Sequence, residues 1–154
     1  MWRNSHMEFN QPFLKLPWRF DVAALSNEVA GLPNDFWLAH PSGLPGNSAV
    51  PLVSVNGEMN HAFDGAMKAT KALTSSPYLS QVVSSFNEVV ARSRLMRLEP
   101  GAEVAEHVDF NYHWVSRVRI HVPIIPDPGV VLYCGEESVH IGGGEGWLFD
   151  VLRR

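Results

Sequence analysis

The sequence predicts an α+β protein in which helices come first and an antiparallel sheet follows. Before residue 91, apolar residues recur at helical spacing in several segments. After residue 91 the pattern changes to alternation, and short alternating segments are separated by closely spaced turns. Helices followed by strands favour α+β over a regular α/β alternation. The turn-rich second half favours an antiparallel sandwich or barrel.

Length and composition predict one soluble domain. The chain has 154 residues, enough for a single domain with a hydrophobic core. We expect one domain over 1–154, with an N-terminal arm and supporting helices in 1–91 and the sheet core in 92–154. The net charge is −4 and basic residues cluster only near residues 92–97 and 117–119, which argues against a nucleic-acid partner.

The same composition constrains compartment and covalent structure. Cys134 is the only cysteine, so the chain cannot form an internal disulfide, and a cytoplasmic location is the simplest expectation. The sequence contains no apolar run of the roughly 20 residues needed to cross a bilayer, and its N-terminus lacks the apolar middle of a secretory signal. We therefore expect no membrane span.

The first half begins with an extended arm and a capped helix. Proline and aromatic residues in 9–20 suit an arm that lies against the body of the protein. Asp21 is placed as a helix N-cap, and the apolar residues that follow it, through Leu32, share one helical face. Gly31 and Pro33 end this helix.

The region that follows contains one strand and two helices. Residues 50–55 predict a short strand inside a Pro- and Gly-rich loop region. A weakly amphipathic helix is expected over 61–73. A better marked helix begins with Ser76 as cap and Pro77 as first residue, and its apolar stripe, which runs to Val90, predicts packing against a sheet.

The second half predicts strands separated by turns. Strand 95–98 is followed by a turn at Pro100-Gly101, and 115–125 is the longest strand candidate. A turn at 126–129 precedes a short buried strand over 130–134. Three consecutive glycines at 142–144 then interrupt the chain before another apolar segment.

The long strand candidate has one apolar and one cationic face. Alternation places Arg117, Arg119 and His121 on one side and Val118 and Ile120 on the other. The simplest interpretation is a solvent-exposed face with ordinary arginines. If these charges instead converge on a site, their guanidinium groups would bind the carboxylate of an acidic small molecule.

His107 and Asp109 form a candidate metal-ligand pair. Side chains two residues apart point the same way in an extended chain, so an imidazole and a carboxylate at this spacing reach one cation. Iron(II) with open coordination positions commonly uses two histidines and one carboxylate. The tripeptide His107-Val108-Asp109 alone is a weak signal. An aspartate that caps a turn beside a packed histidine would produce the same His-x-Asp sequence.

The order of these segments resembles a known family. The run RSRLMRLEPG, HVD, NYHW, RVRIHVPI, VVLYCG, VHIGGGEGWLFD and LRR resembles the aspartyl/asparaginyl β-hydroxylases, which are iron(II)/2-oxoglutarate-dependent oxygenases. The resemblance is dense over about the last 60 residues, and the Pro77-Tyr78-Leu79 helix and the loop at 56–59 are similar to bacterial members.

The resemblance implies a fold, cofactors and residue roles. The implied fold is a double-stranded β-helix, a cupin-like jelly-roll barrel buttressed by N-terminal helices. His107 corresponds to the first iron ligand and Asp109 to the carboxylate ligand of many members. Arg117, Arg119 and His121 match the R-x-R-x-H strand that lines the pocket and binds 2-oxoglutarate or an acidic substrate.

The sequence departs from the family pattern at its end. The second iron-binding histidine and the main 2-oxoglutarate arginine are expected beyond residue 150, and no residue of the given sequence occupies either position. His113, His121 and His140 are more often structural at such positions. We therefore expect a truncated family member with an incomplete barrel, whose exposed strand edges favour pairing in a homodimer.

Three functions fit these residues. The first is hydroxylation of an Asp or Asn side chain, a free amino acid or a related acidic substrate, small or peptidic, with Fe(II) and 2-oxoglutarate. The second is a non-catalytic half-barrel that binds a metal or small ligand and has lost the distal histidine and arginine. The third is zinc-dependent hydrolysis on a cupin barrel, which has only the His107/Asp109 pair behind it.

Overall fold

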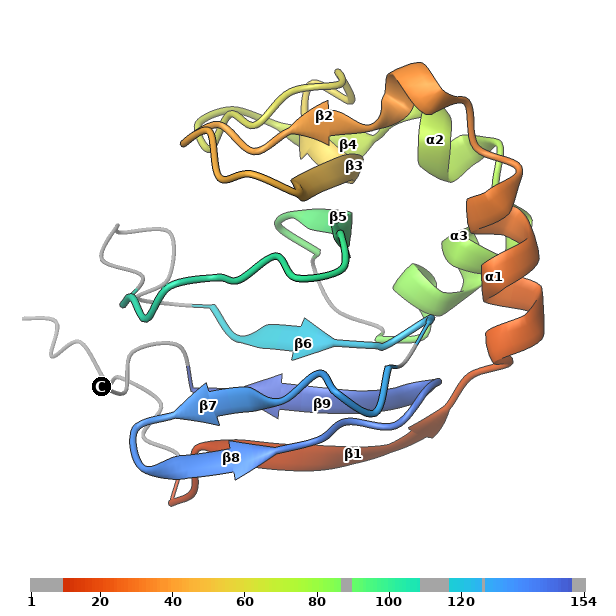
Figure 1. Cartoon of the computed structure of the whole chain (residues 1–154). Coiled ribbons are helices and arrows are strands. Elements are labelled where there is room, and N and C mark those ends of the chain that lie inside the picture. The colour runs from red at the N-terminus through yellow and green to blue at the C-terminus, as the bar shows by residue number, and fades with distance from the viewer. Residues whose placement is uncertain (1–9, 87–89, 109–116, 126, 151–154) are drawn as a thin grey trace, which may run out of the picture. The chain divides into compact units, whose positions relative to one another are not determined.

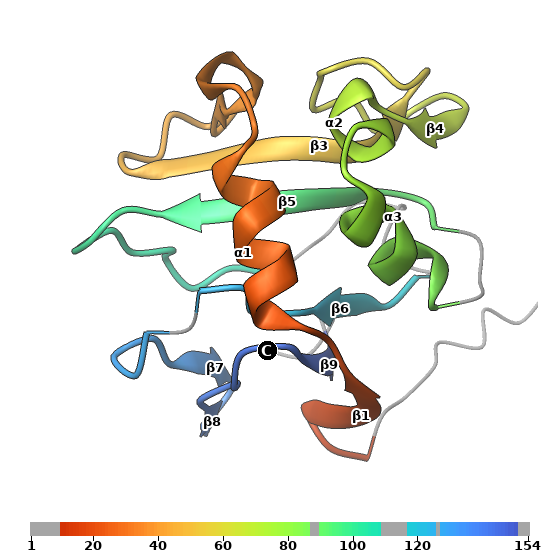
Figure 2. The same cartoon turned by 90° about the vertical axis from the view of Figure 1, so that its right-hand side faces the viewer.

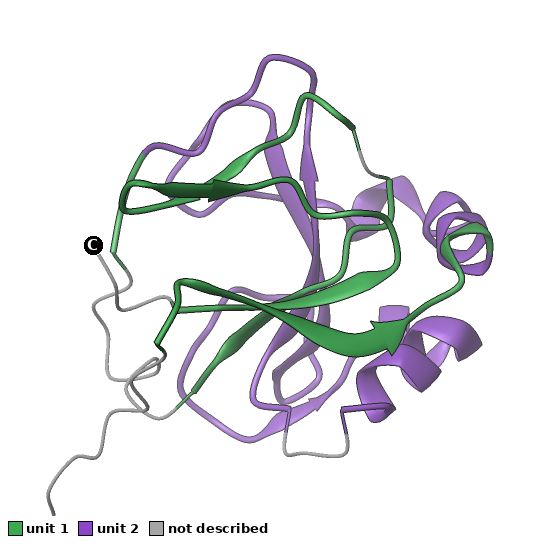
Figure 3. Ribbon diagram, turned by 90° about the horizontal axis from the view of Figure 1, so that it is seen from below, with its two compact units in different colours: residues 1–23, 106–154 green, residues 24–105 purple. Residues whose placement is uncertain are grey.

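The chain divides into two compact units in the computed structural model (Figure 3). The structure describes residues 10–86, 90–108, 117–125 and 127–150. The first unit consists of Met1–Ala23 and Glu106–Arg154, and the second of Ala24–Ala105. The N-terminal arm thus groups with the C-terminal half of the chain. The strand near residue 95, which we expected in the sheet core of 92–154, groups with the residues before it.

The second unit contains a four-stranded antiparallel sheet built around one long strand. Its strands are β2 (Leu38–Ala39), β3 (Asn47–Val55), β4 (Met67–Ala69) and β5 (Ser93–Leu98). Strand β3 pairs with each of the other three, and Figure 2 shows it running alongside β5. The predicted strands at 50–55 and 95–98 are confirmed, and β3 begins three residues earlier than expected.

Strand β3 forms the centre of the hydrophobic core. All of its residues except Ser48 are buried, as expected for a strand covered on both faces. Pro51 is tolerated inside this central strand because the register with β5 shifts between Pro51 and Val53. The fully buried Thr70 donates its hydroxyl to the Pro51 carbonyl at 2.7 Å, so the start of the next helix is fixed to β3.

Four short helical segments accompany this sheet in the sequence. They are α1 (Val22–Ala30), η1 (Asn34–Phe36), α2 (Lys71–Thr74) and α3 (Pro77–Ser84). The expected Asp21 cap is confirmed, because its Oδ1 accepts from the Ala23 N–H at 2.9 Å.

The prediction of a helix over 61–73 is wrong. Residues 67–69 form β4 and only 71–74 are helical. Residues 67–69 pair with residues 53–55 of β3. Backbone hydrogen bonds to an adjacent strand therefore override a weak helical pattern.

The first unit contains a three-stranded antiparallel sheet in the order β1-β9-β6 (Figure 1). Its strands are β1 (Phe13–Arg19), β6 (Arg119–His121) and β9 (Glu145–Phe149). Glycine is required at position 144, the last of the three glycines before β9. Its φ is +74°, and an added Cβ would collide with the Phe20 carbonyl oxygen. Phe20 N–H also donates to the Gly144 carbonyl at 2.8 Å, which fixes the end of β1 to the start of β9.

A separate hairpin lies in the same unit. Strands β7 (Leu132–Cys134) and β8 (Glu137–Val139) pair with each other. The predicted turn before them is confirmed, because Asp127 accepts from the Gly129 N–H through Oδ1 and from the Val130 N–H through its carbonyl.

Two strand predictions in this half need correction. Of the strand expected at 115–125, only Arg119–His121 is a strand among the residues that the structure describes there, because Pro123 lacks the N–H that would continue the ladder. The strand expected to be buried at 130–134 is exposed at several positions, including Tyr133 at 75% and Val130 at 47%. A two-stranded hairpin covers little of its own apolar surface.

The α+β class agrees with the observed antiparallel sheets and helices, whereas the expected order of helices before strands is wrong. Strand β1 precedes α1, and β2 to β4 precede α3. None of the sheets described closes into a barrel, so the jelly-roll fold stays a prediction. No helix among the described residues has the length and apolar character to span a bilayer.

Candidate active site

The cationic strand predicted from the sequence lies at the edge of the first unit's sheet. In β6, Arg119 lies opposite Phe149 and His121 opposite Trp147 of β9. Residues opposite one another in an antiparallel pair project from the same face of the sheet. Arg119 and His121 therefore share one face with two aromatic side chains, as the alternation predicted for these two residues.

Strand β1 adds two residues to this face. Phe13 lies opposite Phe149, and Lys15 lies opposite Trp147. The rings of Phe13 and Phe149 meet edge to face with centroids 5.2 Å apart, a favourable geometry for aromatic pairs. We call this set the mixed face; its residues are Phe13, Lys15, Arg119, His121, Glu145, Trp147 and Phe149. The opposite face carries Leu14, Ile120 and Leu148.

The imidazole of His121 packs on an aromatic ring. Its centroid lies 4.6 Å from that of Phe149, with the two planes tilted by 60°. Because Phe149 also contacts Phe13, three rings from three strands form one continuous cluster. This cluster restricts the orientation of the His121 ring, so that its nitrogen atoms are presented in a defined direction.

Glu145 organises the polar end of the mixed face. Its Oε1 accepts from Lys15 Nζ at 2.6 Å, and its Oε2 accepts from the Trp147 indole N–H and the Gly142 backbone N–H, both at 3.0 Å. The hydrogen bond from Lys15, followed by that from Trp147, lowers the pKa of Glu145 from 4.5 to about 2. The carboxylate is therefore charged at neutral pH, and it compensates the charge of Lys15.

Of the remaining predicted site residues, the structure describes Arg117 and His107, and both lie outside helices and strands. Arg117 is exposed and precedes β6. His107 is exposed and lies in the irregular segment between β5 and β6, while Asp109 lies outside the described residues. In the described part of the chain, no three His, Cys, Asp or Glu side chains come together as a metal site. The assignment of His107 and Asp109 as ligands stays a prediction.

The other candidate histidines differ in their surroundings. His140 donates from Nδ1 to the Val130 carbonyl at 2.9 Å, which links the end of β8 to the segment before β7. This is the structural role that we expected for it. His113 lies outside the residues described here. His121 belongs to the mixed face rather than to an isolated metal position.

Sequence reasoning placed only Arg119 and His121 of the mixed face and missed its other five residues. Glu145 and Trp147 alternate with apolar residues in the segment EGWLF, and this alternation is a strand signal that could have placed them on one face. No local sequence pattern connects Lys15 with the mixed face, because Lys15 lies 130 residues before its partner Glu145. Only the pairing of β1 with β9 brings them together.

A second polar cluster lies in the second unit. His61 donates from Nε2 to the Ala39 carbonyl at 3.0 Å, and within the described residues its buried Nδ1 has no hydrogen-bond partner. Burial lowers the pKa of His61; the hydrogen bond to Ala39 opposes this shift, and the charges of Arg92 and Arg94 add to it. At neutral pH the imidazole is therefore uncharged.

Comparison with known protein families shows which family the chain belongs to. The family model for aspartyl/asparaginyl β-hydroxylase matches residues 55–153, which is well over half of the chain. The chain belongs to the aspartyl/asparaginyl β-hydroxylase family. The matched segment contains β6 and β9 but not β1, so Lys15 and Phe13 come from outside it.

The family assignment favours hydroxylation as the class of chemistry. No curated protein matches the chain, and no solved structure matches it. In this β-hydroxylase family member, the mixed face places two of the predicted site residues, Arg119 and His121, beside aromatic and charged side chains of β1 and β9.

Proposed function

We propose that the protein is an iron(II)- and 2-oxoglutarate-dependent hydroxylase that acts on an acidic substrate, such as an aspartyl or asparaginyl side chain or a free amino acid. The single observation that supports this most is the mixed face, on which Arg119 and His121 stand beside the aromatic residues of β9. This arrangement suits a small carboxylate, because hydrogen-bond donors and aromatic rings lie on the same face of the sheet.

The residues of the mixed face fit an organic anion. A guanidinium donates two parallel N–H groups to a carboxylate, which fixes the carboxylate in plane. Arg119 is half-buried, so its hydrogen bonds are less screened by water than those of a fully exposed arginine. His121 supplies a ring N–H beside it, and Trp147 and Phe149 exclude water from the carbon chain of the bound anion.

His107 and Asp109 would hold the iron. One imidazole nitrogen and one carboxylate oxygen are suitable ligands for iron(II), and the exposure of His107 leaves its ring accessible to a metal. When bound, iron(II) together with 2-oxoglutarate activates O₂ for oxygen insertion into a C–H bond, and succinate and CO₂ leave. The part of the protein is to orient the anion and to keep water from the reacting carbon.

An anaerobic titration tests this proposal. Iron(II) and 2-oxoglutarate are added to the full chain, binding is followed by calorimetry, and succinate and hydroxylated product are measured by mass spectrometry after oxygen and an aspartyl peptide are admitted. We expect wild-type protein to bind both and to form succinate. If it binds neither and forms no succinate, the proposal is wrong. Binding without succinate would favour the non-catalytic binding module.

Two variants assign the roles of the residues. His107→Ala should abolish iron binding but leave the apo protein folded, because the side chain is exposed. Arg119→Met should weaken 2-oxoglutarate binding roughly 10- to 100-fold, the usual effect of losing charge-assisted hydrogen bonds. Arg97→Met is the matched control, because Arg97 lies in the second unit and stacks on Trp37 at 4.2 Å. An equal loss in both arginine variants would contradict the role of Arg119.

A further inference from the structure

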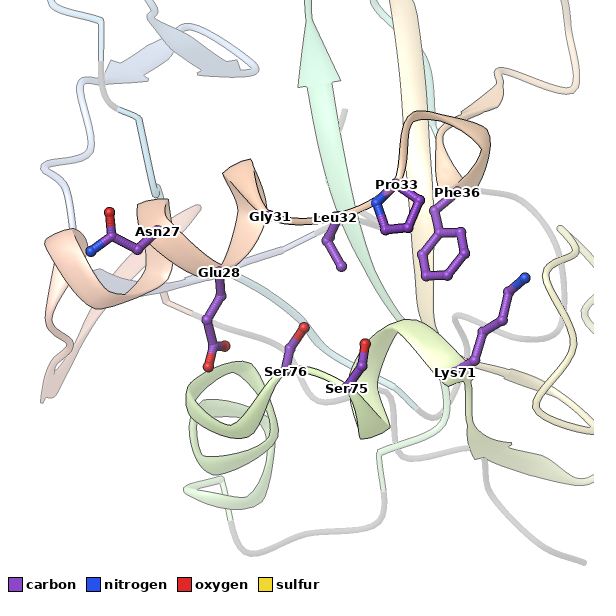
Figure 4. A pocket seen from close by; sticks show the side chains of 9 residues that line it. All are labelled: Asn27, Glu28, Gly31, Leu32, Pro33, Phe36, Lys71, Ser75 and Ser76. Carbon is purple, nitrogen blue, oxygen red and sulfur yellow. The ribbon is translucent and has the colours of Figure 1, made fainter.

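A cavity of about 530 Å³ that is open to solvent lies at the surface of the second unit, beside the ends of α1 and η1 and the starts of α2 and α3 (Figure 4). This volume falls in the range of small-molecule sites. All the residues that line it belong to Ala24–Ala105. None of them belongs to the mixed face, so the cavity is independent of the proposed hydroxylation site.

Ser76 presents a polar group to this cavity that the described protein leaves unsatisfied. The residue is 2% exposed, and Figure 4 shows its oxygen directed into the cavity. Ser76 occupies the N-cap of α3, yet its side chain makes no cap hydrogen bond, and it has no other partner among the described residues. Ser76 Oγ is not one of the fully buried unpaired atoms of the described residues, so its oxygen is accessible from the cavity and can hydrogen-bond to a ligand there.

Glu28 explains why Ser76 is not needed as a cap, and it defines one end of the cavity. Its carboxylate oxygens accept from the Tyr78 and Leu79 N–H groups at 2.7 and 2.8 Å. Glu28 therefore caps α3 in place of the serine, and its negative charge favours the positive end of the helix dipole. Each carboxylate oxygen has a second lone pair, which can accept from a donor in the cavity.

Lys71 defines the other end of the cavity. Its Nζ lies 4.4 Å from the centroid of the Phe36 ring, a cation–π contact that leaves its N–H groups able to donate hydrogen bonds. Figure 4 shows Glu28 and Lys71 on opposite sides of the cavity, with Ser76 between them. Leu32, Pro33 and the Phe36 ring form an apolar wall beside these polar groups.

We propose that this cavity binds a small zwitterionic acid in which a chain of several carbons separates an amine from a carboxylate. The carboxylate accepts from Lys71, and the amine donates to Glu28. Ser76 hydrogen-bonds to the ligand between its two ends, and the carbon chain packs on the apolar wall. A ligand with only one charged group satisfies only one end of the site.

Three probes of similar length test the charge pattern by isothermal titration calorimetry on the full chain. They are ε-aminocaproate, which carries both charges, caproate, which lacks the amine, and hexylamine, which lacks the carboxylate. We expect ε-aminocaproate to bind about threefold to tenfold more tightly than either of the others, because one partly exposed charged contact is lost in each. No binding of any probe, or equal binding of all three, overturns the proposal.

Variants test the residues. Lys71→Met and Ser76→Ala should each weaken ε-aminocaproate binding about threefold to tenfold, and Lys71→Arg should retain binding. The matched controls Lys68→Met and Ser84→Ala change exposed residues that do not line the cavity and should bind as the wild type does. Wild-type affinity in both Lys71→Met and Ser76→Ala overturns the proposal. Unfolding does not obscure the result, because Lys71 is exposed and Ser76 makes no cap hydrogen bond.

Discussion

Strands β3 and β9 are both central strands of antiparallel sheets, yet their surroundings are opposite. Eight of the nine residues of β3 are buried, whereas Gly146 is the only buried residue in β9. Among the described residues, every buried hydrophobic side chain of the core except Ile141 lies in the second unit. The second unit therefore holds most of the apolar burial, and the first unit presents charged and aromatic groups at a half-exposed sheet.

This difference separates most of the packed aliphatic core from the sheet that carries the predicted residues Arg119 and His121. Burial of aliphatic side chains is the largest favourable contribution to folding. Polar groups on a half-exposed sheet avoid the free-energy cost of burial without a partner. In the first unit, ring contacts and the Lys15–Glu145 ion pair connect the strands instead, and these contribute less than a packed core.

The largest expected effect is on the core of the second unit. Leu52→Ala removes a side chain that is 3% exposed and should lower the free energy of unfolding by about 2–5 kcal/mol. Leu14→Ala, at a residue of β1 that is 38% exposed, is the control and should cost about 1 kcal/mol or less. Urea denaturation followed by circular dichroism measures both. Equal losses of unfolding free energy in the two variants would contradict the difference in burial between the two sheets.

The next effect concerns the carboxylate that caps α3. Glu28→Ala removes two acceptors for backbone N–H groups and should cost about 1–2 kcal/mol. Asp35→Ala, which removes an exposed carboxylate in η1, should change stability by less than about 0.5 kcal/mol. Chemical denaturation of both variants distinguishes a cap from a general effect of negative charge.

The ion pair of the mixed face predicts a pH dependence. The pKa of Glu145 is lowered from 4.5 to about 2, so the folded state favours the charged carboxylate. Its contribution is present above pH 4.5 and is lost as the pH falls toward 2. Glu145→Gln should flatten this part of the stability profile, whereas Glu137→Gln, at an exposed residue of β8, should not. If the pH dependence of stability is the same in Glu145→Gln as in the wild type, the Lys15–Glu145 ion pair is not its source.

The smallest expected effect on stability is at the predicted anion-binding residue. Arg119→Met should change the free energy of unfolding by about 1 kcal/mol or less, because it alters a half-buried residue at the edge of the sheet. The same variant is expected to lose ligand affinity. A variant that instead loses several kcal/mol of stability would show that Arg119 supports the fold rather than a site.

Local signals predicted several elements correctly. Asp21 and Pro77 mark helix starts, and both helices are observed. The Asp127 turn follows from Asp and Gly chemistry within four residues. The alternation of Arg119 with Ile120 predicted which residues share a face of β6. These predictions succeed because the responsible interactions lie within a few residues of one another.

Predictions failed where partners distant in the sequence decide the structure. Residues 67–69 adopt a strand because β3 offers them backbone partners. The short extent of β6 follows from Pro123 and from the five-residue length of its partner β9. A weak local pattern does not override such pairing, since backbone hydrogen bonds must be satisfied across the sheet.

The sequence by itself determined the α+β class, the family resemblance and the alternation that places Arg119 and His121 on one face. Only the tertiary structure placed Lys15 and Phe13 beside Trp147 and Phe149, and only it replaced Ser76 with Glu28 as the cap of α3. The reason is physical. Alternation and capping motifs are local and can be recognised in the sequence, but strand order and helix docking depend on burial and pairing between segments far apart in the chain.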